Sequence, residues 1–258
     1  MSKSFGMRKQ LNLVFFKVYA ELKAEASRSF LGVLWWLIEP VLYLGAFYVL
    51  FVLVLQHGGA DFVPGFLCGI VVWKLFDAGV KSGGNALSAN AILLQQVYVP
   101  KYIFPLSAVL GVALRFLPVF VVLCFFLLFY MDGVVSTWLW SMPLILLQFF
   151  LVFSLAVLVS SIIPFVPDLR VAIDNGMMFL FFISGVFFDI STVDEPVKSI
   201  LMLNPMAVMI SAYRDVLLLN NIPDFWSLAA VFAFSISVLV VGLIFLNRWD
   251  RQYAKARF

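Results

Sequence analysis

Charged residues are nearly absent from the middle of this chain and are concentrated at its two ends. Of its 258 residues, 64% are hydrophobic and 12% are charged, and the mean hydropathy is +1.07. A lipid bilayer is the solvent that suits this composition, because the apolar runs are long enough to cross about 30 Å of hydrocarbon. The sequence therefore predicts an all-α membrane protein with one polytopic domain.

Six apolar segments are predicted to span the membrane. They are residues 31–55, 63–80, 106–130, 138–163, 175–188 and 225–246. Basic residues cluster at both termini and in the connections assigned to the inside, whereas the connections 56–62 and 131–137, assigned to the outside, lack Lys and Arg. By the positive-inside rule, the number of crossings is even and both termini are cytoplasmic.

The N-terminal segment, residues 1–30, is predicted to be a cytoplasmic amphipathic interface helix. Leu11, Val14 and Val18 recur there at helical spacing among basic side chains, a pattern typical of helices in the headgroup plane. The six-span domain then occupies residues 31–258. Both cysteines fall in apolar runs, so no disulfide is expected.

One apolar segment, residues 206–219, is too short for a span. It has about 14 residues and is interrupted by Arg214 and Asp215, whereas a span needs about 20. Counting it as a seventh span would place the basic C-terminal tail outside, against the positive-inside rule. A re-entrant or interfacial hairpin before the last span is therefore predicted.

Four ionisable residues lie inside predicted spans: Glu39, Lys74, Asp77 and Arg115. Each costs about 2.5–3.5 kcal/mol at the bilayer centre. Lys74 and Asp77 are three residues apart and are expected to pair with each other. For Arg115 two interpretations stay open, namely contact with a carboxylate or water-filled path used in function, and a structural pair with Asp77.

An aromatic stripe lies on the first predicted span. Trp36, Tyr43 and Phe47 share one helical face, and Glu39 lies about 60° from that line. Aromatic rings with few polar partners suit a path for sugars, so these residues and Arg115 are candidate substrate-path residues. The alternative is an interfacial aromatic belt with ordinary packing.

Catalytic chemistry is not indicated anywhere in the chain. His57 is the single histidine, so no histidine pair or metal cluster is expected, and no phosphate-binding loop for ATP occurs. Asp168 and Asp174 flank Arg170, and an Arg170–Asp174 ion pair is the simplest arrangement. We predict no catalytic residue, metal or cofactor in this chain. Its basic ends indicate orientation and anionic lipid, not nucleic acid.

Three motifs give the chain a family resemblance. LGVLWWLIEP at 31–40, VYVPKYIFPL at 97–106, and NP at 204–205 followed by YRD at 213–215 resemble the permease subunits of ABC-2 type polysaccharide exporters. Their order and separation match over nearly the whole chain, in both the capsule (KpsM-like) and the O-antigen (Wzm-like) branches. One departure is PDLR at 167–170, where an Arg-Asp pair is expected.

The resemblance implies a multi-pass protein of the bacterial inner membrane that exports a lipid-linked glycan. It implies a homodimer with two copies of a cytoplasmic ABC ATPase, which binds the ATP and Mg²⁺, and periplasmic or outer-membrane export partners. It also implies that the connection 82–101 docks on the ATPase. The expected coupling helix contains Asn90, Leu93, Leu94, Gln95, Gln96, Val97 and Tyr98.

The resemblance to these exporters gives roles to two further sets of residues. Lys17, Lys23 and Arg28 are expected to receive the lipid phosphate of the substrate, with general attraction to anionic lipid as the alternative. The exit-side hairpin is expected to contain Asn204, Pro205, Tyr213, Arg214 and Asp215, with Arg214 and Asp215 paired.

Competing functions are an ABC-2 exporter of a drug or small lipid, an ion-coupled secondary transporter, and a membrane-embedded transferase. A secondary carrier normally has internal repeats and a buried coupling carboxylate, and a transferase needs a carboxylate or histidine constellation. Neither pattern is evident in the sequence. The fold alone does not fix the substrate, so the drug or lipid exporter is the nearest alternative.

Overall fold

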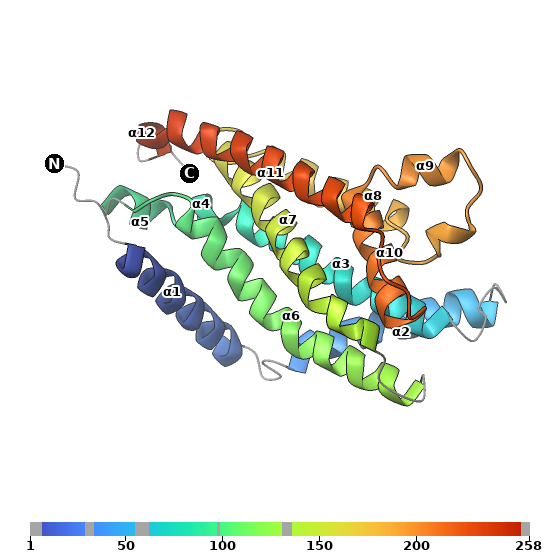
Figure 1. Cartoon of the computed structure of the whole chain (residues 1–258). Helices are drawn as coiled ribbons and strands as arrows, with labels where there is room; N and C mark the ends of the chain where they lie inside the picture. Colours follow the sequence, from blue (N-terminus) through green and yellow to red (C-terminus); the bar gives the residue numbers. More distant parts are fainter. Residues whose placement is uncertain (1–6, 29–33, 55–61, 97–98, 131–135, 254–258) are drawn as a thin grey trace.

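The chain folds into a bundle of long helices (Figure 1). The computed structural model describes residues 7–28, 34–54, 62–96, 99–130 and 136–253, and within these ranges it contains no strand. The longer helices are α1 (Met7–Arg28), α2 (Trp35–Tyr48), α3 (Phe62–Gly84), α6 (Ile103–Tyr130), α7 (Ser141–Ile162), α8 (Leu169–Ile183), α10 (Pro205–Leu217) and α11 (Phe225–Arg248). The shorter ones are η2 (Val49–Val54), α4 (Ala86–Ala89), α5 (Ala91–Gln96), η3 (Ser136–Trp140), η4 (Ile190–Thr192), α9 (Val197–Leu201) and α12 (Asp250–Tyr253).

Four helical segments of the described chain are long and apolar enough to cross a membrane. They are α3, α6, η3 with α7, and α11, with 23 to 28 residues each. At 1.5 Å per residue the shortest is about 34 Å long, which exceeds the hydrocarbon thickness. These segments coincide with the second, third, fourth and sixth predicted spans, and they identify a multi-pass membrane protein.

The first and fifth predicted spans correspond to shorter helices. α2 continues directly into the π-helical segment η2, so the helical path runs from Trp35 to Val54. α8 has 15 residues, about 22 Å, which is less than the hydrocarbon thickness. It begins earlier than the predicted span 175–188, at Leu169. It also ends earlier, because Gly185, with φ of 74°, turns the chain soon after Ile183. The total of six crossings stays a prediction.

Helix α3 is the central element of the bundle. Two thirds of its apolar window is buried (67%), compared with 17% for α11. α3 packs against α6, α7 and α10, and a Cβ on its Gly83 would lie only 2.5 Å from the Cβ of Ala156 on α7. Gly79 approaches Val152 of α7 in the same way. Glycine is therefore needed at these positions for α3 and α7 to approach so closely.

The first turn of α1 lies at the same end of the bundle as α4, α5 and α12 (Figure 1). α1 runs beside the first half of α6, with Val14 and Val18 buried against that helix. Phe15 and Phe16, on another part of the α1 surface, are exposed. An exposed apolar surface on this basic helix suits the predicted location at the membrane interface, which stays a prediction.

Two helices joined by a short turn occupy the place of the predicted hairpin. α9 leads into α10 through a turn that ends at Asn204, and Pro205 is the first residue of α10. The side chain of Asn204 accepts the backbone N–H of Met206 at 3.0 Å and so caps the helix. α10 packs on α3 and α7 at the end opposite α12 (Figure 1). Re-entry of this hairpin into the membrane stays a prediction.

Candidate functional site

The predicted coupling connection folds into two short helices, α4 and α5. Within α5, the side chain of Leu94 is buried, whereas those of Leu93, Gln95 and Gln96 are exposed and the adjacent Ile92 is 73% exposed. A short helix with exposed apolar side chains is a surface suited to a protein partner. Val97 and Tyr98 lie outside the described residues.

Two hydrogen bonds tie helix α1 to this connection and to Tyr102, the residue that follows it. Lys17 Nζ donates to Asn90 Oδ1 at 2.9 Å, and the hydroxyl of Tyr102 donates to Gln10 Oε1 at 2.6 Å. Lys17 Nζ also lies 3.4 Å from Glu21 and 4.7 Å from the ring centroid of Phe104. Burial lowers the pKa of Lys17, and Glu21 opposes that shift. The amino group of Lys17 therefore joins α1 to the coupling connection.

The other two predicted phosphate contacts differ from Lys17. Lys23 lies near the end of α1 with an exposed side chain. Arg28 is the last residue of α1, and its side chain lies outside the described part of the structure. A lipid phosphate has direct access to Lys23, and the role of these basic residues stays a prediction.

An ion pair between a buried lysine and a partly exposed aspartate joins α12 to the start of α6. Lys101, which is 7% exposed, lies 3.0 Å from Asp250 of α12. Beside this pair, the buried Tyr253 donates its hydroxyl to the carbonyl of Ser161 at 2.7 Å. Sequence reasoning missed these contacts. The signal was a single acid, Asp250, within an otherwise basic tail.

The charged residues inside the predicted spans pair differently from the expectation. Lys74 forms an ion pair with Glu39 and lies 4.5 Å from the ring centroid of Tyr43. Asp77 pairs with Lys81, one helical turn further along α3, at 2.6 Å. The predicted Lys74–Asp77 pair is therefore wrong, because α2 packs against α3 and supplies a nearer carboxylate.

Two cavities lie on either side of the Glu39–Lys74 pair. One, of about 330 Å³, lies between α2, α3 and α6 and brings Glu39, Lys74 and Arg115 together. The other, of about 160 Å³, is lined by Tyr43, Lys74 and Asp77 with residues of α8. The predicted aromatic face and the intramembrane charges therefore meet where Tyr43 contacts Lys74. The side chains of Trp36 and Phe47 lie outside the described part of the structure.

Two other ion pairs do not form among the described residues: the Arg115–Asp77 pair, which was one of two open interpretations, and the predicted Arg170–Asp174 pair. Arg115 Nε donates to the carbonyl of Gly111 at 3.2 Å, and no ion pair joins Arg115 to Asp77 among the described residues. Asp174 lies 4.0 Å from Lys81 instead of pairing with Arg170. Both pairs were inferred without knowledge of which helices pack together.

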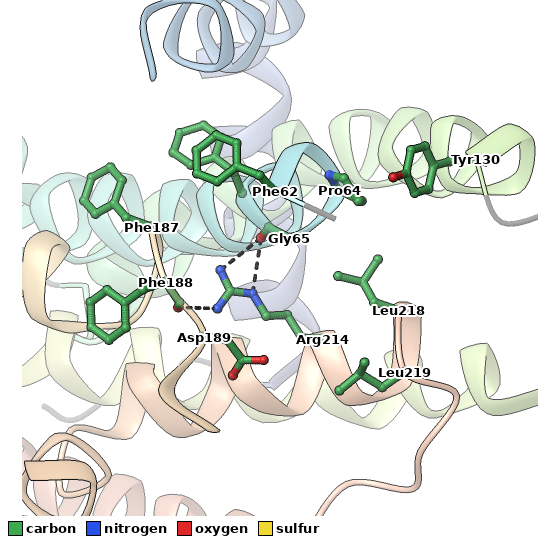
Figure 2. A pocket seen from close by; sticks show the side chains of 11 residues that line it. Phe62, Pro64, Gly65, Tyr130, Phe187, Phe188, Asp189, Arg214, Leu218 and Leu219 are labelled. Atoms are coloured by element: carbon green, nitrogen blue, oxygen red, sulfur yellow. Dashed lines mark hydrogen bonds between the residues drawn. The ribbon is translucent and has the colours of Figure 1, made fainter. Parts of the chain in front are cut away.

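Arg214 on α10 is the most highly connected cation in the described part of the chain. It is 7% exposed, and its guanidinium makes four hydrogen bonds. Two go to the carbonyl of Gly65, at 3.2 and 3.0 Å, and one each to Val186 at 2.9 Å and Phe188 at 2.6 Å. Figure 2 shows the guanidinium between Gly65 and Phe188. It fastens α10 to the start of α3 and to the turn after α8.

The predicted Arg214–Asp215 pair is wrong, because these backbone carbonyls take the guanidinium. Asp215 is half-buried, and burial followed by the nearby carboxylate of Asp189 raises the pKa of Asp215. Tyr213 is fully buried in the core, where its ring packs against Phe120. Of the predicted hairpin residues, Asn204 and Arg214 thus hold α10 in place, while Tyr213 packs it against the core.

Metal ligands are not gathered in the described part of the structure. No group of three or more His, Cys, Asp or Glu side chains lies close enough there to hold a metal ion. His57 lies outside the described residues.

Comparison with known proteins places this arrangement in a family. The ABC-2 type transporter family matches residues 13–218. An O-antigen export system permease protein RfbA from Klebsiella pneumoniae is 27% identical over 91% of both chains. A protein of the same name from Myxococcus xanthus is 28% identical over 93% of both chains. The family match covers most of the chain and includes every helix from α2 to α10, so the chain belongs to the ABC-2 type transporter family.

Proposed function

We propose that this chain is the membrane subunit of an ATP-driven exporter that moves a lipid-linked polysaccharide, of the O-antigen class, across the bacterial inner membrane. The observation that carries the proposal is the similarity to O-antigen export permeases over 91–93% of both chains. That similarity favours O-antigen over capsule, and a polysaccharide over a drug or small lipid.

A separate ATPase supplies the energy in this proposal. The chain has no phosphate-binding loop, so ATP and Mg²⁺ bind to the partner subunit. The exposed Ile92 and Leu93 of α5 provide the apolar contact for that ATPase. Lys17, through Asn90, then transmits movement of α5 to α1.

The conduit lies between two copies of the chain. One side of α8 carries the exposed apolar residues Met178, Phe179 and Phe182, and only Met177 of this helix is buried. α8 also exposes Asp174 and Asn175, which are costly to present to lipid. A second copy and a water-filled path account for both features, with Tyr43 and Lys74 on the adjacent α2 and α3.

In this arrangement both termini are cytoplasmic and α10 lies at the exit side. The lipid phosphate meets Lys23 and Arg28 at the cytoplasmic leaflet, and Lys17 lies behind them. The glycan leaves next to the hairpin of α9 and α10, from which periplasmic and outer-membrane partners take it.

The test is complementation of a deletion strain together with the cognate ATPase. We expect surface O-antigen to return only when both subunits are present, and the purified chain alone to hydrolyse no ATP. ATPase activity of the chain alone would refute the proposal.

The docking surface is tested by Leu93→Asp, which places a charge in the proposed apolar contact. We expect the ATPase to dissociate during copurification and export to be lost. The matched control is Leu203→Asp, because Leu203 is 82% exposed but lies in the turn before α10. Equal loss of the ATPase from both variants would contradict the docking surface.

Topology is tested with single cysteines and an impermeant thiol reagent. Cysteines at Gly59 or Asp132 should be labelled from outside, and cysteines at Ala89 or Ala254 should not. The opposite pattern would overturn the orientation. For the path, Tyr43→Ala should slow export without loss of assembly, and unchanged export would assign Tyr43 to packing.

A further inference from the structure

A third cavity, of about 470 Å³, lies at the end of the bundle opposite α12 and is not explained by the substrate path. Four elements form its walls: the start of α3, the end of α6, the turn after α8 and the end of α10. Figure 2 shows Phe62, Tyr130 and Phe188 around it, with Asp189 beside Arg214. Its volume lies in the range typical of small-molecule sites, about 300–1,000 Å³.

The walls offer aromatic rings to a ligand. Phe62 stacks on Phe66 with ring centroids 5.9 Å apart, and Phe66 lies 5.9 Å from Phe187. The face of an aromatic ring is electron-rich and attracts C–H groups that carry partial positive charge. The flat, C–H-bearing face of a sugar ring meets that requirement better than a flexible polar chain does.

Arg214 and Asp189 offer a donor and an acceptor in the same cavity. A guanidinium has five N–H donors, and four of those on Arg214 bind backbone carbonyls, which leaves one on Nη1. Asp189 Oδ1 accepts the backbone N–H of Ser191 at 2.8 Å, and in the described part of the chain Oδ2 accepts no hydrogen bond. A hydroxyl group can donate to Asp189 Oδ2 and accept from the remaining N–H of Arg214 Nη1.

The charges exclude an anionic ligand. Arg214 and Asp189 both line the cavity, and their opposite charges compensate each other. A phosphate or carboxylate would meet the carboxylate of Asp189 and find one remaining N–H on Arg214. A neutral ring with hydroxyl groups meets no such repulsion.

We propose that this cavity binds a neutral sugar unit of the polysaccharide as it leaves the exporter. The proposal rests on the proposed function, and it adds a saccharide site in each subunit beside the hairpin. Arg214 has two roles there: four N–H groups hold the walls together, and the fifth faces the ligand.

The test uses the complete permease–ATPase complex in lipid nanodiscs. The probe is an oligosaccharide of a few repeat units, taken from the surface glycan of the strain that encodes the exporter and released from its lipid by mild acid. Its Kd is measured by calorimetry. Asp189→Asn keeps one oxygen to accept the Ser191 N–H but loses the second. We expect Kd to rise about tenfold, as for a lost hydrogen bond to a charged group.

A second variant, Phe188→Leu, removes a ring and keeps the carbonyl that accepts from Arg214. We expect it also to weaken binding, whereas the control Phe234→Leu, an exposed residue of α11, should leave Kd unchanged. Unchanged Kd in both pocket variants would overturn the site. Weaker binding in Phe188→Leu alone would show that Asp189 does not hold the sugar and would overturn the site as proposed.

Export by the wild-type complex separates this proposal from the function on which it rests. Restored surface glycan without oligosaccharide binding would overturn the sugar site and leave the proposed function intact. Failure to restore the glycan with both subunits present would overturn both.

Discussion

Removal of the Arg214 guanidinium should release the hairpin from the rest of the bundle. In Arg214→Gln, the carbonyls of Gly65, Val186 and Phe188 lose hydrogen bonds of 2.6–3.2 Å. A hydrogen bond to a charged group contributes about 1.5–3 kcal/mol, and bonds that share one group are not additive. We therefore expect the free energy of unfolding to fall by about 3–5 kcal/mol.

The assay is thermal melting of the purified protein. The measured quantity is the fraction of protein that remains monodisperse after heating. At about 2–4 °C per kcal/mol for a chain of this size, the melting temperature should fall by about 6–20 °C. Arg214→Lys should recover less than half of this loss, because one ammonium group cannot reach three separate carbonyls.

The control is Asp215→Asn. Its carboxyl group makes no ion pair with Arg214, and its pKa is raised by burial, so a neutral amide should be tolerated within about 2 °C. A fall in Asp215→Asn as large as that in Arg214→Gln would mean that the two side chains stabilise each other. Such a result would refute the carbonyl contacts as the cause of stability.

Other contacts give predictions of similar kind. Lys101→Met should destabilise the protein by about 1–3 kcal/mol, because it leaves the partly exposed Asp250 unpaired. In a thermal melt, the double exchange of Lys101→Asp with Asp250→Lys should recover at least half of this loss. No recovery in the exchange would exclude a direct pair. Gly83→Ala should lower the melting temperature, since its new Cβ would meet Ala156, whereas Gly111→Ala on α6 has no atom within 4 Å and should be neutral or stabilising. The same sign in both glycine variants would contradict the packing of α3 on α7.

The long spans could be predicted from the sequence because the hydrophobic pattern is a local property. The helices at these positions, α3, α6, η3 with α7, and α11, are each longer than the hydrocarbon thickness, and no tertiary information is needed to find their apolar runs. Asn204 and Pro205 were expected in the hairpin, and in the structure they cap and begin α10, a local arrangement that depends on neighbouring residues only.

The pairing of charges could not be predicted because it depends on which helices meet. Lys74 and Asp77 were matched by their spacing along one helix, yet Glu39, 35 residues from Lys74, is the actual partner. Arg214 was matched to its neighbour in the sequence, although its carbonyl partners come from Gly65 and from the turn after α8. Backbone acceptors leave no trace in amino-acid composition, so the sugar cavity around Arg214 had no signal in the sequence.

The close approach of α3 and α7 limits which helices of this subunit can move relative to each other. Between Gly83 and Ala156 there is no layer of side chains that can change rotamer, so these two helices resist sliding past each other. α2 and α8 contact α3 over shorter lengths. Opening for transport is therefore expected to displace these outer helices around a fixed inner pair, and variants that alter gating should fall on α2 and α8.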